Sequence, residues 1–193
     1  EDANAPLLVL GPGTGLGVSA LMPVVEGPLP VEGEGGNIRF APQTELERDL
    51  CAYIEKQTDH VVVEHFVSGP GLENIHRFLV NSAGIEPSLS AEMIATSALR
   101  EEGICRDAVN LMIGILGAVM RDHVLTMGCW RGAVITGGIM PRLQSLINSS
   151  PLKQRFRSAG DMSHILGNVP VWLSTDPLAG LKGAQVAFGN PYL

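Results

Sequence analysis

Positively charged residues are scarce in this sequence. Lysine and arginine total 13 against 20 aspartates and glutamates, which gives a formal net charge of -7 over 193 residues. Because the chain is acidic and has no basic run, it repels a phosphate backbone, and general nucleic-acid binding is excluded. Only 17% of the residues are charged while 45% are apolar. This balance excludes intrinsic disorder and predicts a folded domain.

Cysteine is also scarce, and neither cysteine nor histidine follows the spacing of a disulfide or metal framework. An odd count of three cysteines, far apart in the sequence, favours a reducing, cytoplasmic environment. The five histidines do not have the spacing of zinc ligands, so we predict no metal site made of protein side chains. The residues concerned are Cys51, Cys105, Cys129, His60, His65, His76, His123 and His164.

Long hydrophobic runs are absent. The longest covers residues 108–120 and is interrupted by Asn110, whereas a membrane-spanning helix needs about 20 apolar residues. We therefore expect a buried core helix there and no association with a membrane. The polar start, Glu1–Pro6, has no signal-peptide character and no initiator methionine. We expect the chain to begin inside a longer protein.

Strand and helix patterns alternate along a length that fits one domain. Two apolar runs, Leu7–Leu10 and Val18–Val25, flank a glycine-rich turn and predict a β-hairpin. Residues 26–30 are typical of a loop, and the apolar run 61–67 of an extended segment. The other expected elements are helices after Thr44, near Leu72, after Ser90, at about Cys105, at Pro141, at Pro151 and at about Leu178, and strands at 133–135 and 171–173. This order predicts an α/β fold with a mixed sheet.

The turn of the predicted hairpin, Gly11–Gly17, carries four glycines and a threonine. A dinucleotide-binding fold would need a glycine where Leu16 stands, and no Gly-Lys-Ser/Thr follows as in a P-loop. Several glycines let backbone N–H groups converge on an anion, and the threonine adds a hydroxyl donor. An ordinary flexible turn is the alternative. The candidate residues are Gly11, Gly13, Thr14 and Gly15.

Two carboxylates stand out in the sequence, and the first of them can hold a sugar. Glu34 lies among glycines that let the backbone bend close to a ligand. Its carboxylate can accept hydrogen bonds from two adjacent hydroxyls, and Asn37 can donate and accept at a neighbouring one. A solvated loop glutamate is the alternative for Glu34. Glu64 interrupts the apolar run 61–67 and is either exposed at an alternate position or buried with a partner.

A fourth candidate follows the predicted strand at 133–135. Gly137, Gly138 and Ile139 stand between this strand and the helix expected at Pro141. Ligands of α/β proteins bind at the carboxyl ends of strands, and glycines there permit the close approach of a flat base or a ribose. Taken alone, this motif is short and weakly specific.

Together, and in this order, the motifs resemble those of the bacterial glucokinase family within the sugar kinase, actin and heat-shock ATPase superfamily. The family's hairpin, Gly-x-Gly-Thr-Gly-Leu-Gly, resembles residues 11–17, and its Glu-Gly-Gly-His-x-x-Phe-Ala-Pro motif resembles residues 34–42. Its Glu-x-x-x-Ser-Gly-Pro-Gly-Leu motif is similar to residues 64–72, and its adenosine motif to residues 136–142. The resemblance covers nearly the whole chain.

The resemblance implies a ribonuclease H-like, actin-type ATPase lobe with a mixed sheet flanked by helices. It also implies ATP-dependent glucokinase activity, the first step of glycolysis. ATP phosphates would lie on the hairpin with Mg²⁺ bridging them, and the γ-phosphoryl group would pass to the sugar 6-hydroxyl. A homodimer is expected by resemblance only. Glucose would be bound by Glu34, Asn37 and Glu64, and adenosine by Gly137, Gly138 and Ile139.

Two departures from the family pattern matter. Asn37 stands where the family has histidine and cannot titrate, so we expect sugar affinity or choice to differ. In the family, a first lobe with an Asp-x-Gly-Gly-Thr motif and an Asn-Asp pair precedes the hairpin, and neither motif occurs here. We therefore expect residues 1–193 to be the C-terminal large lobe of a two-lobe kinase, inactive without the catalytic aspartate of the first lobe. The alternatives are a catalytically dead sugar- or nucleotide-binding module and a kinase for another hexose.

Overall fold

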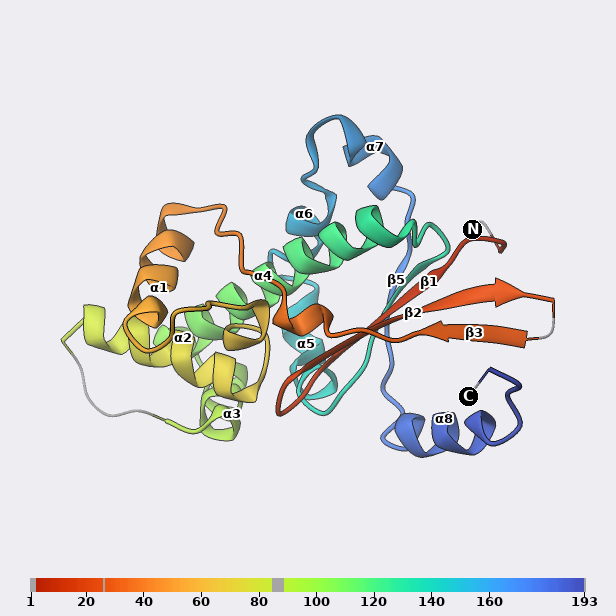
Figure 1. Cartoon of the computed structure of the whole chain (residues 1–193). Coiled ribbons are helices and arrows are strands. Elements are labelled where there is room, and N and C mark those ends of the chain that lie inside the picture. Colours follow the sequence, from red (N-terminus) through yellow and green to blue (C-terminus); the bar gives the residue numbers. More distant parts are fainter. Residues whose placement is uncertain (1–2, 26, 85–88, 193) are drawn as a thin grey trace.

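Figure 1 shows a computed structural model that describes residues 3–25, 27–84 and 89–192. Its framework is a five-stranded sheet in the order β3-β2-β1-β4-β5. The strands are β1 (Leu7–Pro12), β2 (Leu16–Val24), β3 (Gly27–Val31), β4 (Gly132–Ile135) and β5 (Val171–Leu173). β1 pairs antiparallel with β2 and parallel with β4, so the sheet is mixed and the predicted fold class is confirmed.

Helices flank this sheet, and their packing is organised around α4. Helices α2 and α3 pack on α4, α1 packs on α2, and α6 crosses α4 closely (Figure 1). The helices are α1 (Glu45–Glu55), α2 (Gly69–Ser82), α3 (Ala91–Arg100), α4 (Ile104–Met127), α5 (Gln144–Ile147), α6 (Leu152–Arg157), α7 (Ser163–Leu166) and α8 (Ala179–Ala187), and the 3₁₀ turns are η1 (Gly35–Asn37), η2 (Val63–His65), η3 (Met140–Leu143) and η4 (Gly160–Met162).

Helix α4 is the centre of the hydrophobic core. Among the described residues it is the one helix long and apolar enough to cross a membrane, and 78% of its apolar window is buried inside the fold. This burial confirms the sequence expectation of a core helix. Gly117 allows α6 to approach closely, because a Cβ there would collide with the Leu152 carbonyl oxygen. The helix ends at Gly128, whose φ of 64° lies in the left-handed region that favours glycine.

The predicted loop at residues 26–30 is wrong for residues 27–30, which form most of β3. This strand pairs antiparallel with β2, and it contains Pro28 and Pro30. Proline has no backbone N–H to donate and is tolerated only at the edge of a sheet, where β3 lies. Glu26 is outside the described residues.

The predicted extended segment at residues 61–67 is also wrong. Its first two residues pair with residues 38–40, but the chain then makes the 3₁₀ turn η2 and enters α2. Ser68 caps α2, because its hydroxyl accepts the Gly71 N–H at 2.9 Å and donates to the Glu64 carbonyl at 2.8 Å. A helix that starts here forces the chain to turn first, and that turn carries Glu64.

Candidate functional site

The hairpin between β1 and β2 ends in a tight turn of three residues. Pro12 pairs with Leu16 across the strands, which leaves Gly13, Thr14 and Gly15 as the turn. The Gly13 N–H donates to the Gly15 carbonyl at 2.8 Å, and Thr14 is exposed at the tip. Apart from Gly13 and its two chain neighbours, no described atom lies within 4 Å of the position that a Gly13 Cβ would take, so this side of the turn is open.

The beginning of α2 lies against this turn. The Gly69 N–H donates to the Gly13 carbonyl at 2.8 Å. A Cβ at Gly69 would lie 3.7 Å from Ile139 Cδ1, so the loop after β4 reaches the same point. Because α2 is 14 residues long, its N-terminus is the positive end of a helix dipole, although Pro70 has no N–H and the Gly71 N–H donates to the Ser68 hydroxyl. The hairpin turn, the helix N-terminus and the loop after β4 therefore form one cradle.

Gly137 brings the loop after β4 onto the hairpin. Its φ of 91° is rare for residues with a side chain, and a Cβ there would collide with the Pro12 carbonyl oxygen. A Cβ at Gly11 would lie 3.4 Å from Thr136 Cγ2, and Gly138 is exposed beside them. The two segments that the sequence identifies as nucleotide-binding candidates are therefore adjacent.

Glu64 is half-buried against the second half of the hairpin turn. The Leu16 N–H donates to Glu64 Oε2 at 2.7 Å. Gly15 makes room for this carboxylate, because a Cβ there would lie 2.5 Å from Oε2. Of the two placements that the sequence leaves open for Glu64, the structure has the one with a partner.

Glu34 and Asn37 lie at the turn η1, beside β2. Glu34 forms an isolated parallel bridge with Val18, and the side chains of Glu34 and Asn37 are exposed. A Cβ at Gly35 would lie 2.7 Å from the Val18 Cβ, and one at Gly36 would collide with the β2 backbone. The Asn37 N–H donates to the Glu34 carbonyl at 2.9 Å. The two glycines are therefore needed to seat Glu34 on β2.

A pocket of about 410 Å³ connects the hairpin with this turn. Its lining includes Gly11 and Gly17 of the hairpin, Glu34, and Thr136 at the end of β4. The volume is within the range of small-molecule sites, which is about 300–1,000 Å³. Glu64 is not among the lining residues. The structure thus brings Glu34 to the hairpin through a shared pocket and Glu64 through a hydrogen bond.

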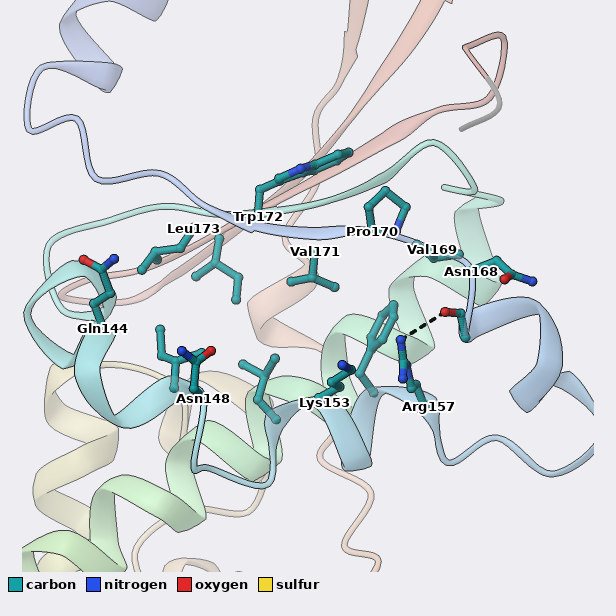
Figure 2. A pocket seen from close by; sticks show the side chains of 15 residues that line it. Gln144, Asn148, Lys153, Arg157, Asn168, Val169, Pro170, Val171, Trp172 and Leu173 are labelled. Carbon is teal, nitrogen blue, oxygen red and sulfur yellow. Dashed lines mark hydrogen bonds between the residues drawn. The ribbon is translucent and has the colours of Figure 1, made fainter.

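A larger pocket, of about 610 Å³, lies away from these motifs. It is formed between β5 and the helices α5 and α6. Figure 2 shows Lys153 and Arg157 at its wall and the Trp172 ring turned to the other face of β5. Arg157 donates to the Gly167 carbonyl at 3.1 Å. None of the predicted site residues lines this pocket. Pocket size therefore does not locate the candidate site, whereas the convergence of the motifs does.

Three residues that shape the candidate site have no place in the sequence prediction. Ser68 fixes the turn of Glu64, and a serine just before Gly-Pro-Gly is a recognisable signal, because serine is a favoured N-cap and proline is favoured in the first helical turn. Arg121 and His123 lie in α4 behind the segment that carries Glu34. They stand within the apolar pattern of a core helix, which gives no signal of such a role.

The fold and the cradle define a class of protein. A glycine turn at a helix N-terminus, next to a glycine loop at the carboxyl end of a parallel strand, is typical of phosphate- and nucleotide-binding sites. The architecture is that of the sugar kinases with an actin-like ATPase fold. The model of the family described as Glucokinase matches residues 1–191. The chain belongs to the glucokinase family.

Relatives of known sequence and structure agree with this assignment. The glucokinase of Aromatoleum aromaticum is 37% identical over 192 residues, covering 98% of this chain and 58% of that protein. The crystal structure of a glucokinase from an Antarctic psychrotroph has a TM-score of 0.89 at 34% identity, over 98% of this chain and 59% of that one. A ROK-family glucokinase from Streptomyces griseus, solved with glucose and AMPPNP, shares the fold with a TM-score of 0.62 at 18% identity, over 95% and 59% of the two chains. The chain therefore spans less than two thirds of the length of these relatives.

Proposed function

We propose that this chain is the C-terminal large lobe of an ATP-dependent glucokinase, which transfers the γ-phosphoryl group of ATP to the 6-hydroxyl of glucose. The observation that carries the proposal is the meeting of all four motifs at one hairpin. Gly69 bonds to Gly13, Gly137 abuts Pro12, and Glu64 accepts a hydrogen bond from β2. Membership of the glucokinase family supports the choice of reaction.

Glu34, Asn37 and Glu64 are the sugar-binding residues in this proposal. Glu34 is exposed at the rim of the 410 Å³ pocket, and its two oxygens can accept hydrogen bonds from neighbouring hydroxyls. Glu64 uses Oε2 for the Leu16 N–H, which leaves Oε1 for a sugar hydroxyl. Asn37 can donate and accept at a third hydroxyl. A sugar at this place would face the hairpin turn, where the phosphates are proposed to lie.

The cradle fits a nucleotide. The turn is open at Gly13, the space around a Cβ of Gly138 is also open, and the positive end of the α2 dipole lies at the same point, while the Gly69 and Gly71 N–H groups already have partners within the fold. Bound ATP would supply the phosphoryl group, and a Mg²⁺ ion bound with it would neutralise charge on the phosphates. The part of this chain is to donate N–H groups of the hairpin turn and the Thr14 hydroxyl. The proposed phosphate-binding residues are Gly11, Gly13, Thr14 and Gly15, and the proposed adenosine-binding residues are Gly137, Gly138 and Ile139.

The proposal includes a first lobe that supplies the general base and completes the site. The share of the relatives' length that this chain spans supports it. The apolar side chains of Leu181 and Phe188 on helix α8 are 70% and 95% exposed, which is compatible with a covering surface such as the first lobe. By family likeness we also propose a cytoplasmic location and a homodimer.

Two alternatives rest on Asn37, the residue that departs from the family pattern. A histidine at this position can titrate and an asparagine cannot. In the first alternative, this change shifts the sugar preference from glucose to another hexose. The same change is compatible with a catalytically dead module that still binds sugar or nucleotide. Both alternatives keep the geometry of the cradle and differ from the main proposal in the reaction.

A coupled assay of ATP turnover separates these possibilities. The samples are this chain alone and the full-length protein that contains it, each with glucose, mannose or N-acetylglucosamine. We expect turnover with glucose from the full-length protein and none from the chain. Turnover by the chain alone would overturn the claim that the general base is supplied by the first lobe. Turnover with another hexose but not with glucose would support a kinase for that hexose. The absence of turnover with all three hexoses would support the catalytically dead module.

Substitution of the two carboxylates in the full-length protein tests their roles. We expect Glu34→Gln and Glu64→Gln each to weaken glucose binding about 10- to 150-fold, because a hydrogen bond to a charged acceptor contributes roughly 1.5–3 kcal/mol. The KM for ATP stays constant. Glu45→Gln, on the exposed face of α1, is the matched control. Unchanged glucose affinity in both variants would refute the assigned roles.

A further inference from the structure

The C-terminal half of α4 contacts the turn that carries Glu34. His123 is buried, and its Cε1 would lie 2.9 Å from a Cβ at Gly35. The ring forms a hydrogen bond with the backbone of Gly35. Its Nε2 is buried and has no partner in the described part of the chain, so the bond is made by Nδ1. An imidazole is therefore bound directly to the residue that follows Glu34.

Burial and the contact with Gly35 act on the pKa of the His123 ring in opposite directions. Burial lowers the pKa of His123, because the charged imidazolium is disfavoured there, while the Gly35 backbone and Asp122 act in the opposite direction. The hydrogen bond to Gly35 raises the pKa, which is the effect of a bond that the ring donates, so the Gly35 carbonyl is the acceptor. The contact is thus a fixed hydrogen bond between a core helix and the sugar-binding turn.

Arg121 holds the other end of the same segment. Its Nη1 donates to Gln43 Oε1 at 3.3 Å and to the Ser158 carbonyl at 2.8 Å. The Gln43 N–H donates in turn to Glu47 Oε2 at 2.7 Å. Residues 34–43 are therefore tied to α4 near both ends and to α1 at the second end. Asn37, between these two contacts, is exposed, whereas the side chains that hold the segment, Arg121, His123 and Glu47, are buried.

We propose that His123 is a positioning residue for glucose binding, because its imidazole fixes Gly35 and thereby sets where the Glu34 carboxylate stands on β2. The inference rests on the proposed function of Glu34. The Glu34 side chain makes no capping hydrogen bond and is exposed, so the backbone decides its position. Loss of the ring leaves a cavity and an unpaired carbonyl behind Gly35. The turn can then shift, and small misplacements of a binding group reduce its effect strongly.

Three variants separate positioning from general core packing. His123→Leu fills the space and removes the donor. His123→Asn retains a donor close to the position of Nδ1. His76→Leu is the matched control, because His76 is also a buried histidine with an unpartnered nitrogen among the described residues, but it lies in α2. Only the first variant loses the hydrogen bond to Gly35.

The first measurement is amide hydrogen exchange on this chain, which requires no activity. The Asn37 N–H bonds the Glu34 carbonyl and reports on η1. We expect His123→Leu to raise its exchange rate about tenfold through local opening, and His123→Asn and His76→Leu to leave it within about twofold. Equal effects of His123→Leu and His76→Leu, or no effect of His123→Leu, would overturn the positioning role.

The second measurement is steady-state kinetics of the full-length protein. We expect His123→Leu to raise the KM for glucose about tenfold with the KM for ATP unchanged. In His123→Asn, the KM for glucose is expected to stay close to that of the unsubstituted protein. An equal rise in both KM values, or a glucose KM that His123→Leu does not move, would overturn the inference. If the unsubstituted full-length protein phosphorylates no hexose, the proposed function fails and glucose positioning fails with it. Amide exchange still decides whether His123 fixes the turn.

Discussion

Glu34 and Glu64 are proposed to bind the same ligand, and the fold holds them in different ways. Glu64 is half-buried, its Oε2 accepts the Leu16 N–H, and its own carbonyl accepts the Ser68 hydroxyl. Glu34 is exposed, and its side chain makes no capping hydrogen bond. Its position depends on Gly35, on the bridge to β2 and on the buried groups behind the segment.

Glu64 therefore has a role in the fold besides its proposed role in sugar binding, whereas for Glu34 only the proposed role in sugar binding is apparent. Glu64 satisfies a backbone N–H at the hairpin turn, so its removal changes the protein even when no ligand is present. The Glu34 side chain is exposed and caps no backbone N–H of η1. The segment that carries Glu34 contacts residues that are far away in the sequence, in α1 and α4. Stability measurements can therefore separate two residues that a binding assay does not.

The largest effect is expected at the buried anchor of the Glu34 segment. Glu47 accepts the Gln43 N–H and pairs with Arg155 at 2.6 Å, and the two charged side chains are 2% and 16% exposed. Glu47→Ala leaves Arg155 without its carboxylate in a mostly buried place, which costs about 3–5 kcal/mol. Urea unfolding of this chain measures the loss. Glu45→Ala, exposed on the same helix, is expected to change stability by less than about 0.5 kcal/mol. Similar losses in both variants would contradict the anchoring role.

The comparison itself is tested by replacing each site carboxylate with alanine in this chain. Glu64→Ala leaves the Leu16 N–H unpaired in a half-buried place, so we expect a loss of about 1–3 kcal/mol. Glu34→Ala is expected to stay within about 0.5 kcal/mol of the parent. Urea unfolding without sugar or nucleotide gives both values. Glu64→Gln retains an oxygen acceptor and is expected to recover most of the loss. Equal stabilities of the two alanine variants would remove the distinction.

Local signals were sufficient for the hairpin, the core helix and the order of the motifs. Glycines between two apolar runs predict the turn, and the apolar run at 108–120 predicts α4. The strand β3 was not predictable in the same way, because Pro28 and Pro30 oppose a strand unless it lies at the edge of a sheet. Edge position is a property of the whole sheet, and no short segment reveals it.

In the candidate site too, local sequence signals identify some residues, and only tertiary packing identifies the others. The sequence places Glu64 in an apolar run and cannot show that the chain turns there, since the turn depends on pairing with residues 38–40 and on the Ser68 cap. Motif reasoning does not find Arg121 and His123, because their partners in the Glu34 segment, Gln43 and Gly35, are far away in the sequence and only packing brings them together. The roles assigned to the site residues stay predictions until the variants are measured.

The smallest expected effect concerns pH and the α2 side of the molecule. Burial lowers the pKa of His76 from its ordinary value of 6.5. The unfolded chain therefore binds the proton more readily than the folded one. The contribution of neutral His76 to stability is complete above pH 6.5 and declines as the pH falls below it. We expect the urea midpoint of the parent to decrease between pH 7 and pH 5.5, and the decrease to be smaller in His76→Gln. His164→Gln, at an exposed histidine, is the control and should leave the slope unchanged. A slope that His76→Gln does not reduce would mean that the ring is solvated in the folded chain, and His123 would then be the histidine to test for the acid sensitivity.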